Sequence, residues 1–281
     1  MKRLLVCSDG SEYSQVCYQY ADWLAGRTGA SIDVLYLTDI RQFEVPLIAD
    51  LSGSLGIQPY QDVMSQLQEI EKEKAALIEA TCRKILTERD QDGGVSVHHH
   101  TGLLVDCLED YEADVDLVML GKRGENADFA SEHIGSTAER VIRASKKPCL
   151  VTSRAFMPIK KIVLAYDGGQ SCRKAAEFLA SSNAFKELEL HIVSVVEDKD
   201  KPAAEKFLES AAETVRAGGY EPVCEVLEGE VEAAIAGYVE SEGMELLVMG
   251  AYGHNRIRYL LIGSSTTEMI RSCHIPVLCF R

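Results

Sequence analysis

The strongest constraint on the fold is an internal duplication of the sequence. Three segments of the first half recur in the second, in the same order and with similar spacing. They are KRLLVCSDGS, DLVMLGKRG and IGSTAERVIRASKKPCLV, which return as KKIVLAYDGG, ELLVMGAYG and IGSSTTEMIRSCHIPVLC. Such a repeat over the whole length predicts two copies of one domain. We place them at residues 1–153 and 159–281, joined by the short segment RAFMP at residues 154–158.

Within each half, short apolar runs alternate with segments of helical spacing. Residues 4–7 form such a run, and the segment 11–26 that follows has apolar residues at Val16, Tyr20 and Leu24. The alternation predicts an α/β protein with two repeated open parallel five-stranded sheets, each with helices on both faces. The predicted strands are 4–7, 32–37, 95–100, 117–120 and 149–151, and then 162–165, 190–195, 223–227, 246–249 and 277–280. The predicted first-half helices are 11–26, 61–89, 103–111 and 137–143.

A glycine-rich loop follows the predicted strand 246–249. Its glycines are Gly250, Gly253 and Gly263, and the hydroxyl residues Ser264, Ser265 and Thr266 come next, where a helix is expected to begin. Glycines allow a backbone to approach a ligand closely, and a helix N-terminus offers free N–H groups to an anion. The loop carries the basic residues His254, Arg256 and Arg258 and no acid, which suits a polyanion. Spacing alone also fits an ordinary loop with turn glycines and an N-cap.

Together with the segment IVLAYDGG at residues 162–169, this loop resembles the universal stress protein family, and the resemblance covers essentially the whole chain. In that family a G-x2-G-x9-G-[S/T] pattern marks members that bind ATP, and residues 250–264 match it letter for letter. The resemblance implies a Rossmann-like fold of the adenine nucleotide alpha hydrolase type. It also implies a regulatory or stress-response protein with ATP, alone or with Mg²⁺, as the bound cofactor.

The resemblance also implies roles for individual residues. Asp167 would hold the ribose hydroxyls, Ala165 and Val195 would flank the adenine, and the glycine loop with Ser264 and Ser265 would take the phosphates. A carboxylate can accept two hydroxyl hydrogen bonds, so the chemistry is consistent. The expected nucleotide-binding set is Ala165, Tyr166, Asp167, Gly168, Val195, Met249, Gly250, Gly253, His254, Arg256, Gly263, Ser264, Ser265 and Thr266. No residue is assigned a catalytic or metal-binding role.

The first half departs from the family pattern. Gly121 and Gly124 are present, but ten residues instead of nine precede Gly135. The intervening segment carries the acids Glu125, Asp128 and Glu132. Three carboxylates would repel a triphosphate unless they held a metal ion. The first half is therefore either a differently tuned, metal-assisted site or a degenerate copy kept for assembly, and we favour the second interpretation.

Composition excludes several classes of function. The formal net charge of −15 disfavours sequence-independent binding to nucleic acid or to an anionic membrane. No apolar run approaches the roughly 18 residues of a membrane span, and MKRLLVCSDGSE lacks the pattern of a signal peptide. The nine cysteines include no C-x-x-C pair, which favours reduced thiols in a cytoplasmic protein.

The sequence favours a nucleotide-binding protein without dedicated catalysis. It contains no Walker lysine motif and no evident general base for attack on a γ-phosphate. A slow ATPase is the enzyme alternative, and a nucleotide-free scaffold for protein interactions is the third possibility. Which stress, which partner protein and which adenine nucleotide are involved are questions that the sequence leaves open.

The last strand of each half suggests how the chain assembles. PCLV at residues 148–151 and PVLC at residues 276–279 are short and apolar, and an edge strand of this kind tends to pair with another edge. In the family, single-domain members dimerise through this strand. Because a short tether gives a high effective concentration, we expect the two edges to pair antiparallel within one chain, as an internal pseudo-dimer. We also expect a homodimer through other surfaces.

Overall fold

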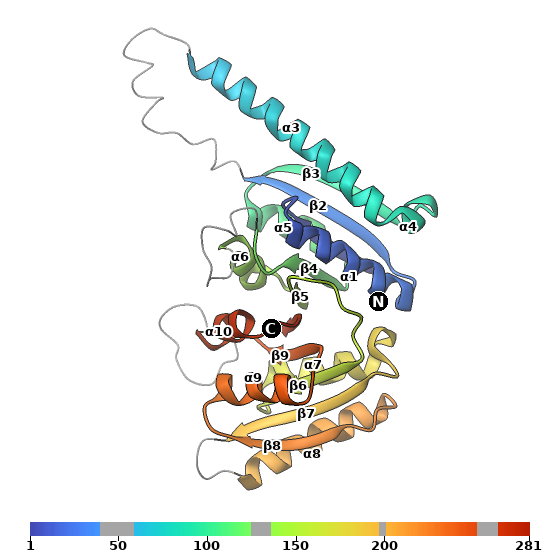
Figure 1. Ribbon diagram of the computed structural model, residues 1–281, viewed down its shortest axis with the longest axis vertical. Helices are drawn as coiled ribbons and strands as arrows, with labels where there is room; N and C mark the ends of the chain where they lie inside the picture. The colour runs from blue at the N-terminus through green and yellow to red at the C-terminus, as the bar shows by residue number, and fades with distance from the viewer. Residues whose placement is uncertain (40–58, 125–135, 197–200, 252–263) are drawn as a thin grey trace.

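The computed structural model describes residues 1–39, 59–124, 136–196, 201–251 and 264–281 (Figure 1). Within these residues, ten strands form a single sheet in the order β3-β2-β1-β4-β5-β10-β9-β6-β7-β8. The first-half strands are β1 (Arg3–Ser8), β2 (Ser31–Asp39), β3 (Val95–Gly102), β4 (Leu117–Gly121) and β5 (Cys149–Thr152). The second-half strands are β6 (Lys161–Ala165), β7 (Glu189–Val196), β8 (Val223–Glu228), β9 (Leu246–Gly250) and β10 (Val277–Phe280). The two predicted five-stranded sheets are thus present, but they are joined edge to edge.

Helices cover both faces of this sheet, because the buried strands alternate apolar side chains between two helix layers. One layer contains α1 (Glu12–Thr28), α3 (Pro59–Ile85), α4 (Thr87–Gln91), α7 (Gln170–Ser181) and α8 (Lys201–Ala217), with the short 3₁₀ helix η3 (Asn183–Phe185). The other contains α5 (Leu104–Glu112), α6 (Ser136–Ala144), α9 (Val231–Ser241) and α10 (Ser264–Ser272). Leu4 and Val6 of β1 point into the first layer, and Leu5 points into the second.

Local sequence signals set the helix ends. At α1 the Ser11 side chain accepts a hydrogen bond from the Ser14 N–H, which satisfies one free donor of the first turn. The helix ends at Gly29, whose φ of 71° is left-handed and whose N–H bonds the Ala25 carbonyl oxygen at 2.8 Å. The prediction of a single helix at residues 61–89 is wrong in one respect. It is interrupted at Leu86, whose side chain is fully buried in the core, and α4 follows.

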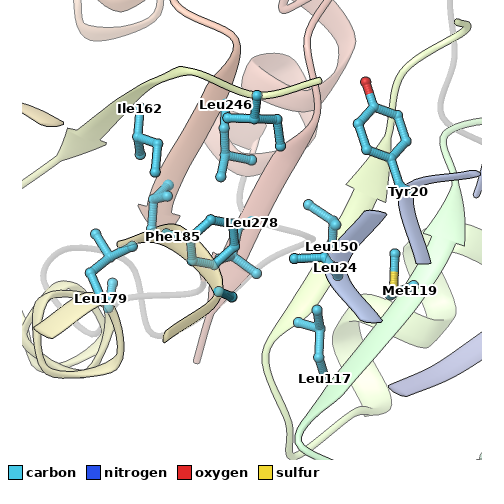
Figure 2. Packing of buried hydrophobic residues seen from close by; sticks show 14 of the residues in the cluster. Tyr20, Leu24, Leu117, Met119, Leu150, Ile162, Leu179, Phe185, Leu246 and Leu278 are labelled. Atoms are coloured by element: carbon cyan, nitrogen blue, oxygen red, sulfur yellow. The ribbon is translucent and has the colours of Figure 1, made fainter. Parts of the chain in front are cut away.

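The last strands of the two halves pair antiparallel, as the sequence predicts. Leu150 of β5 lies opposite Leu278 of β10, and Cys149 lies opposite Cys279. Leu150 and Leu278 hold the same position in the two repeats, so the register is symmetric, as a pseudo-two-fold axis between the halves requires. Buried side chains from both halves meet here in one continuous core (Figure 2).

The linker between the two halves contacts α1. The Tyr20 hydroxyl lies 3.1 Å from the Ser153 hydroxyl and accepts a hydrogen bond from the Met157 N–H at 3.3 Å. The Tyr20 ring packs edge-on against Phe156, with 4.9 Å between ring centroids. These contacts hold the segment 154–158 against the first half. Across the described ranges, no helix is long and apolar enough to traverse a bilayer.

Candidate functional site

The strand order reverses beside β6. The chain runs outward through β6, β7 and β8 and then returns to place β9 on the other side of β6. In open parallel sheets, ligands bind beyond the carboxyl ends of the strands at such a point. Ala165 ends β6 and is paired with Met249 of β9, and Val195 lies near the end of β7. The structure therefore brings these three predicted residues to the same edge of the sheet.

The turn between β6 and α7 presents the predicted carboxylate. The Tyr166 side chain is buried, and its N–H bonds the Val193 carbonyl oxygen at 2.8 Å. Asp167 is exposed, and its Oδ1 accepts a hydrogen bond from the Gly169 N–H at 2.7 Å. Gly168 has a left-handed φ of 76°, which lets the chain turn directly into α7. The carboxylate thus lies at the solvent-facing tip of the turn, beside the start of a helix.

Gly250 has a packing role besides its place in the glycine motif. A Cβ atom there would lie 2.8 Å from the Cys172 Sγ and 3.2 Å from the Cys172 backbone nitrogen. The first distance is shorter than real Cβ contacts and the second is tight, so a larger residue would force the first turn of α7 to shift away from the end of β9. Gly121 has the same role in the first half, where a Cβ would lie 2.7 Å from the Tyr13 Cβ.

The phosphate end of the predicted site is described only in part. Helix α10 begins at Ser264, so the expected helix start directly after the last motif glycine is confirmed. Thr266, in its first turn, is buried. The other predicted phosphate-binding residues, Gly253, His254, Arg256 and Gly263, lie outside the described residues. For Ser264 and Ser265 the structure describes the helical backbone.

The corresponding turn of the first half differs in its hydrogen bonding. Asp9 Oδ1 accepts hydrogen bonds from the Ser11 N–H at 3.0 Å and from the Ser14 hydroxyl at 2.7 Å. The repeat places Cys172 where the first half has Ser14, and the Cys172 thiol donates to the Ala165 carbonyl oxygen at 3.5 Å. The hydroxyl that donates to the first carboxylate is therefore replaced by a thiol, which is a weaker donor.

The first-half loop also closes on its own carboxylate. A Cβ added at Gly124 would lie 2.5 Å from Asp9 Oδ2, so the loop backbone is directly against this oxygen. Asp9 is only partly exposed, whereas Asp167 is exposed.

The model of the universal stress protein family matches the chain twice, at residues 1–153 and 158–281. The chain belongs to the universal stress protein family. It is 44% identical over 288 residues to the universal stress protein Slr1230 of Synechocystis, and the match covers 100% of both chains. Among solved structures, a universal stress protein from Archaeoglobus fulgidus has a TM-score of 0.65 and 22% identity. That match covers 99% of this chain and 98% of the other.

Two side chains beside the turn of this universal stress protein, Cys172 and Tyr166, stay protonated at neutral pH. Burial and the Asp167 charge together raise the pKa of the Cys172 thiol to about 12. Burial likewise raises the pKa of the Tyr166 hydroxyl. Neither of these two groups is therefore activated as a nucleophile or base.

No metal site is evident in the described ranges, where no group of three His, Cys, Asp or Glu side chains converges. The acids of the first-half loop, Glu125, Asp128 and Glu132, lie outside these ranges. The metal-assisted interpretation of that loop therefore stays a prediction, as does the degenerate one.

Sequence reasoning missed two residues at the turn. Phe207 of α8 packs on it, since a Cβ at Gly168 would lie 2.9 Å from the Phe207 Cδ1. No sequence signal pointed to Phe207, because α8 is far from the turn along the chain. Cys172 could have been found by aligning the repeats, because it replaces Ser14.

Proposed function

We propose that this universal stress protein binds ATP, mainly through its second domain, in a regulatory or stress-response role without dedicated catalysis. The observation that carries the proposal is the difference between the two aspartates. Asp167 is exposed at the strand-order reversal beside Ala165 and Met249. Both aspartates accept a hydrogen bond from an N–H of their own turn, but Asp9 also accepts one from the Ser14 hydroxyl and is less exposed.

The chemistry of the turn supports an adenine nucleoside. Ala165 and Val195 offer small apolar surfaces at the ends of neighbouring strands, which suits a flat base. The exposed carboxylate of Asp167 can accept hydrogen bonds from two ribose hydroxyls. The G-x2-G-x9-G-S pattern that leads into α10 supports placing the phosphates at the N-terminus of that helix.

The direct test is to denature freshly purified protein and to identify any released nucleotide by mass. Calorimetric titration of the nucleotide-free protein should then give one tight ATP site per chain. Two equal sites would contradict the asymmetry between the domains. The absence of any ATP binding would favour the nucleotide-free scaffold instead. Release of phosphate above background would indicate the slow ATPase.

The role of Asp167 has its own test. Asp167→Ala should weaken ATP binding about tenfold or more, because a hydrogen bond to a charged acceptor contributes about 1.5–3 kcal/mol. Asp9→Ala is the matched control, since it removes the equivalent carboxylate from a turn already closed by Ser14 and Gly124. The control should keep its ATP affinity within about twofold. Equal losses in both variants would show that the first domain contributes to binding.

A further inference from the structure

The two domains cap each other's last helices across their boundary. Lys122, in the loop after β4, donates from Nζ to the carbonyl oxygens of Arg271 (2.8 Å) and Cys273 (2.9 Å) at the end of α10. In return, the guanidinium of Arg281 donates to the carbonyl oxygen of Arg143 at the end of α6. Arg143 and Arg271 hold the same position in the two repeats. Each helix C-terminus, where the dipole favours positive charge, thus receives a cation from the opposite domain.

The antiparallel junction explains why Lys122 can reach α10. Val151, near the end of β5, lies opposite Val277 at the start of β10. The end of α10, which directly precedes β10, is therefore brought beside the carboxyl ends of β4 and β5. The Lys122 backbone is held at this edge, because its N–H donates to the Thr152 carbonyl oxygen at 3.3 Å. The repeat places Ala251 at the equivalent position of the second domain, and alanine has no side-chain donor.

We propose that Lys122 is a positioning residue for the nucleotide site of the second domain, so that the first domain's glycine loop controls α10. The inference rests on the proposed function. Helix α10 has nine residues and is therefore roughly 13 Å long. Its first turn follows the motif glycine, and its last turn is held by Lys122. Because the backbone hydrogen bonds of a short helix make it move nearly as a unit, we expect release of its last turn to shift the N–H groups of its first turn.

The test compares ATP affinity, measured by calorimetry, in the full-length wild type, Lys122→Met and Arg281→Met. Lys122→Met should weaken ATP binding about fivefold or more, at the lower end of typical coupling between sites. Arg281→Met is the matched control, because it removes a cation that crosses the same boundary but caps α6 of the other domain. Its affinity should stay within about twofold of wild type.

The possible outcomes separate the two proposals. A wild type that does not bind ATP overturns the proposed function itself. A wild type that binds, with Lys122→Met equally tight, overturns the positioning role alone. Equal weakening in Lys122→Met and Arg281→Met also overturns it, because the boundary as a whole would then be responsible.

The pH dependence of ATP affinity provides a second readout, because a rise in pH removes the charge of Lys122 without any substitution. Burial lowers the pKa of Lys122 to about 8, the nearby Cys273 acts in the opposite direction, and Arg123 acts in the same direction as burial. Below this pH the cap carries a charge, and above it the charge is lost. The Cys172 thiol, with its pKa near 12, stays protonated throughout, and the phosphates of ATP are already largely ionised.

Wild-type affinity for ATP should therefore fall about twofold to fivefold between pH 7 and pH 9, the loss expected for a helix-capping charge. Lys122→Arg keeps the donors and the charge at all these pH values, so its affinity should be constant over the same interval. A wild type with constant affinity, or an arginine variant with the same decline as the wild type, would overturn the proposal.

Discussion

Leu278→Ala should lower the free energy of unfolding by about 2–5 kcal/mol, the usual cost of truncating a fully buried leucine. Leu278 is 0% exposed and lies in the middle of β10, between β9 of its own domain and β5 of the other. Figure 2 shows its side chain among buried residues of the core at the junction. Alanine would leave a cavity where the domains meet, and a continuous sheet leaves little freedom to close it.

Denaturant unfolding monitored by circular dichroism measures this effect. We expect a single transition in the wild type, because the sheet and one core cluster run through both domains. Leu150→Ala is the matched variant, because Leu150 is 1% exposed and faces Leu278 in a symmetric register. The two variants should lose similar stability, and the double variant should depart from additivity, since the residues are in contact range. Two well-separated transitions, with only one shifted by Leu278→Ala, would show that the domains unfold independently.

The strands could be predicted because their signal is local. A buried parallel strand is a short apolar run bounded by turn residues, and LLVM at residues 246–249 is visible as one without knowledge of the rest of the chain. The interruption of the long helix at Leu86 could not be predicted in this way. It depends on where one leucine fits into the core that α1 and β2 form.

The candidate site likewise has one part that the sequence predicts and another part that it does not. The glycine pattern and Asp167 are adjacent in sequence to predicted strand ends, so their meeting at one edge of the sheet follows from the topology. The lower exposure of Asp9 depends on the Ser14 hydroxyl and on the loop backbone at Gly124, which pack against its carboxylate. The contact between Lys122 and the end of α10 depends on how the two domains pack, and no periodic pattern in the sequence indicates that packing.

Gly218→Ala should destabilise the protein by about 3 kcal/mol or more, at the upper end of the usual cost of overpacking. A Cβ at Gly218 would lie 2.4 Å from the carbonyl oxygen and 2.5 Å from the Cα of Ala180, at the end of α7. These are backbone atoms, which cannot move aside as the end of a flexible side chain can. The clash would push α8 away from α7, and α7 begins at the turn that carries Asp167.

Gly237→Ala is the control variant, in which we expect the stability of the protein to rise slightly. Gly237 is exposed within α9, and a Cβ there would meet nothing within 4 Å. Replacing glycine by alanine in the interior of an exposed helix typically stabilises by about 0.5–1 kcal/mol, because the unfolded chain loses freedom and helix propensity rises. Thermal unfolding should therefore give a lower Tm for Gly218→Ala and a slightly higher Tm for Gly237→Ala. If the two variants shifted the Tm in the same direction, the close contact between the ends of α7 and α8 would not be the cause.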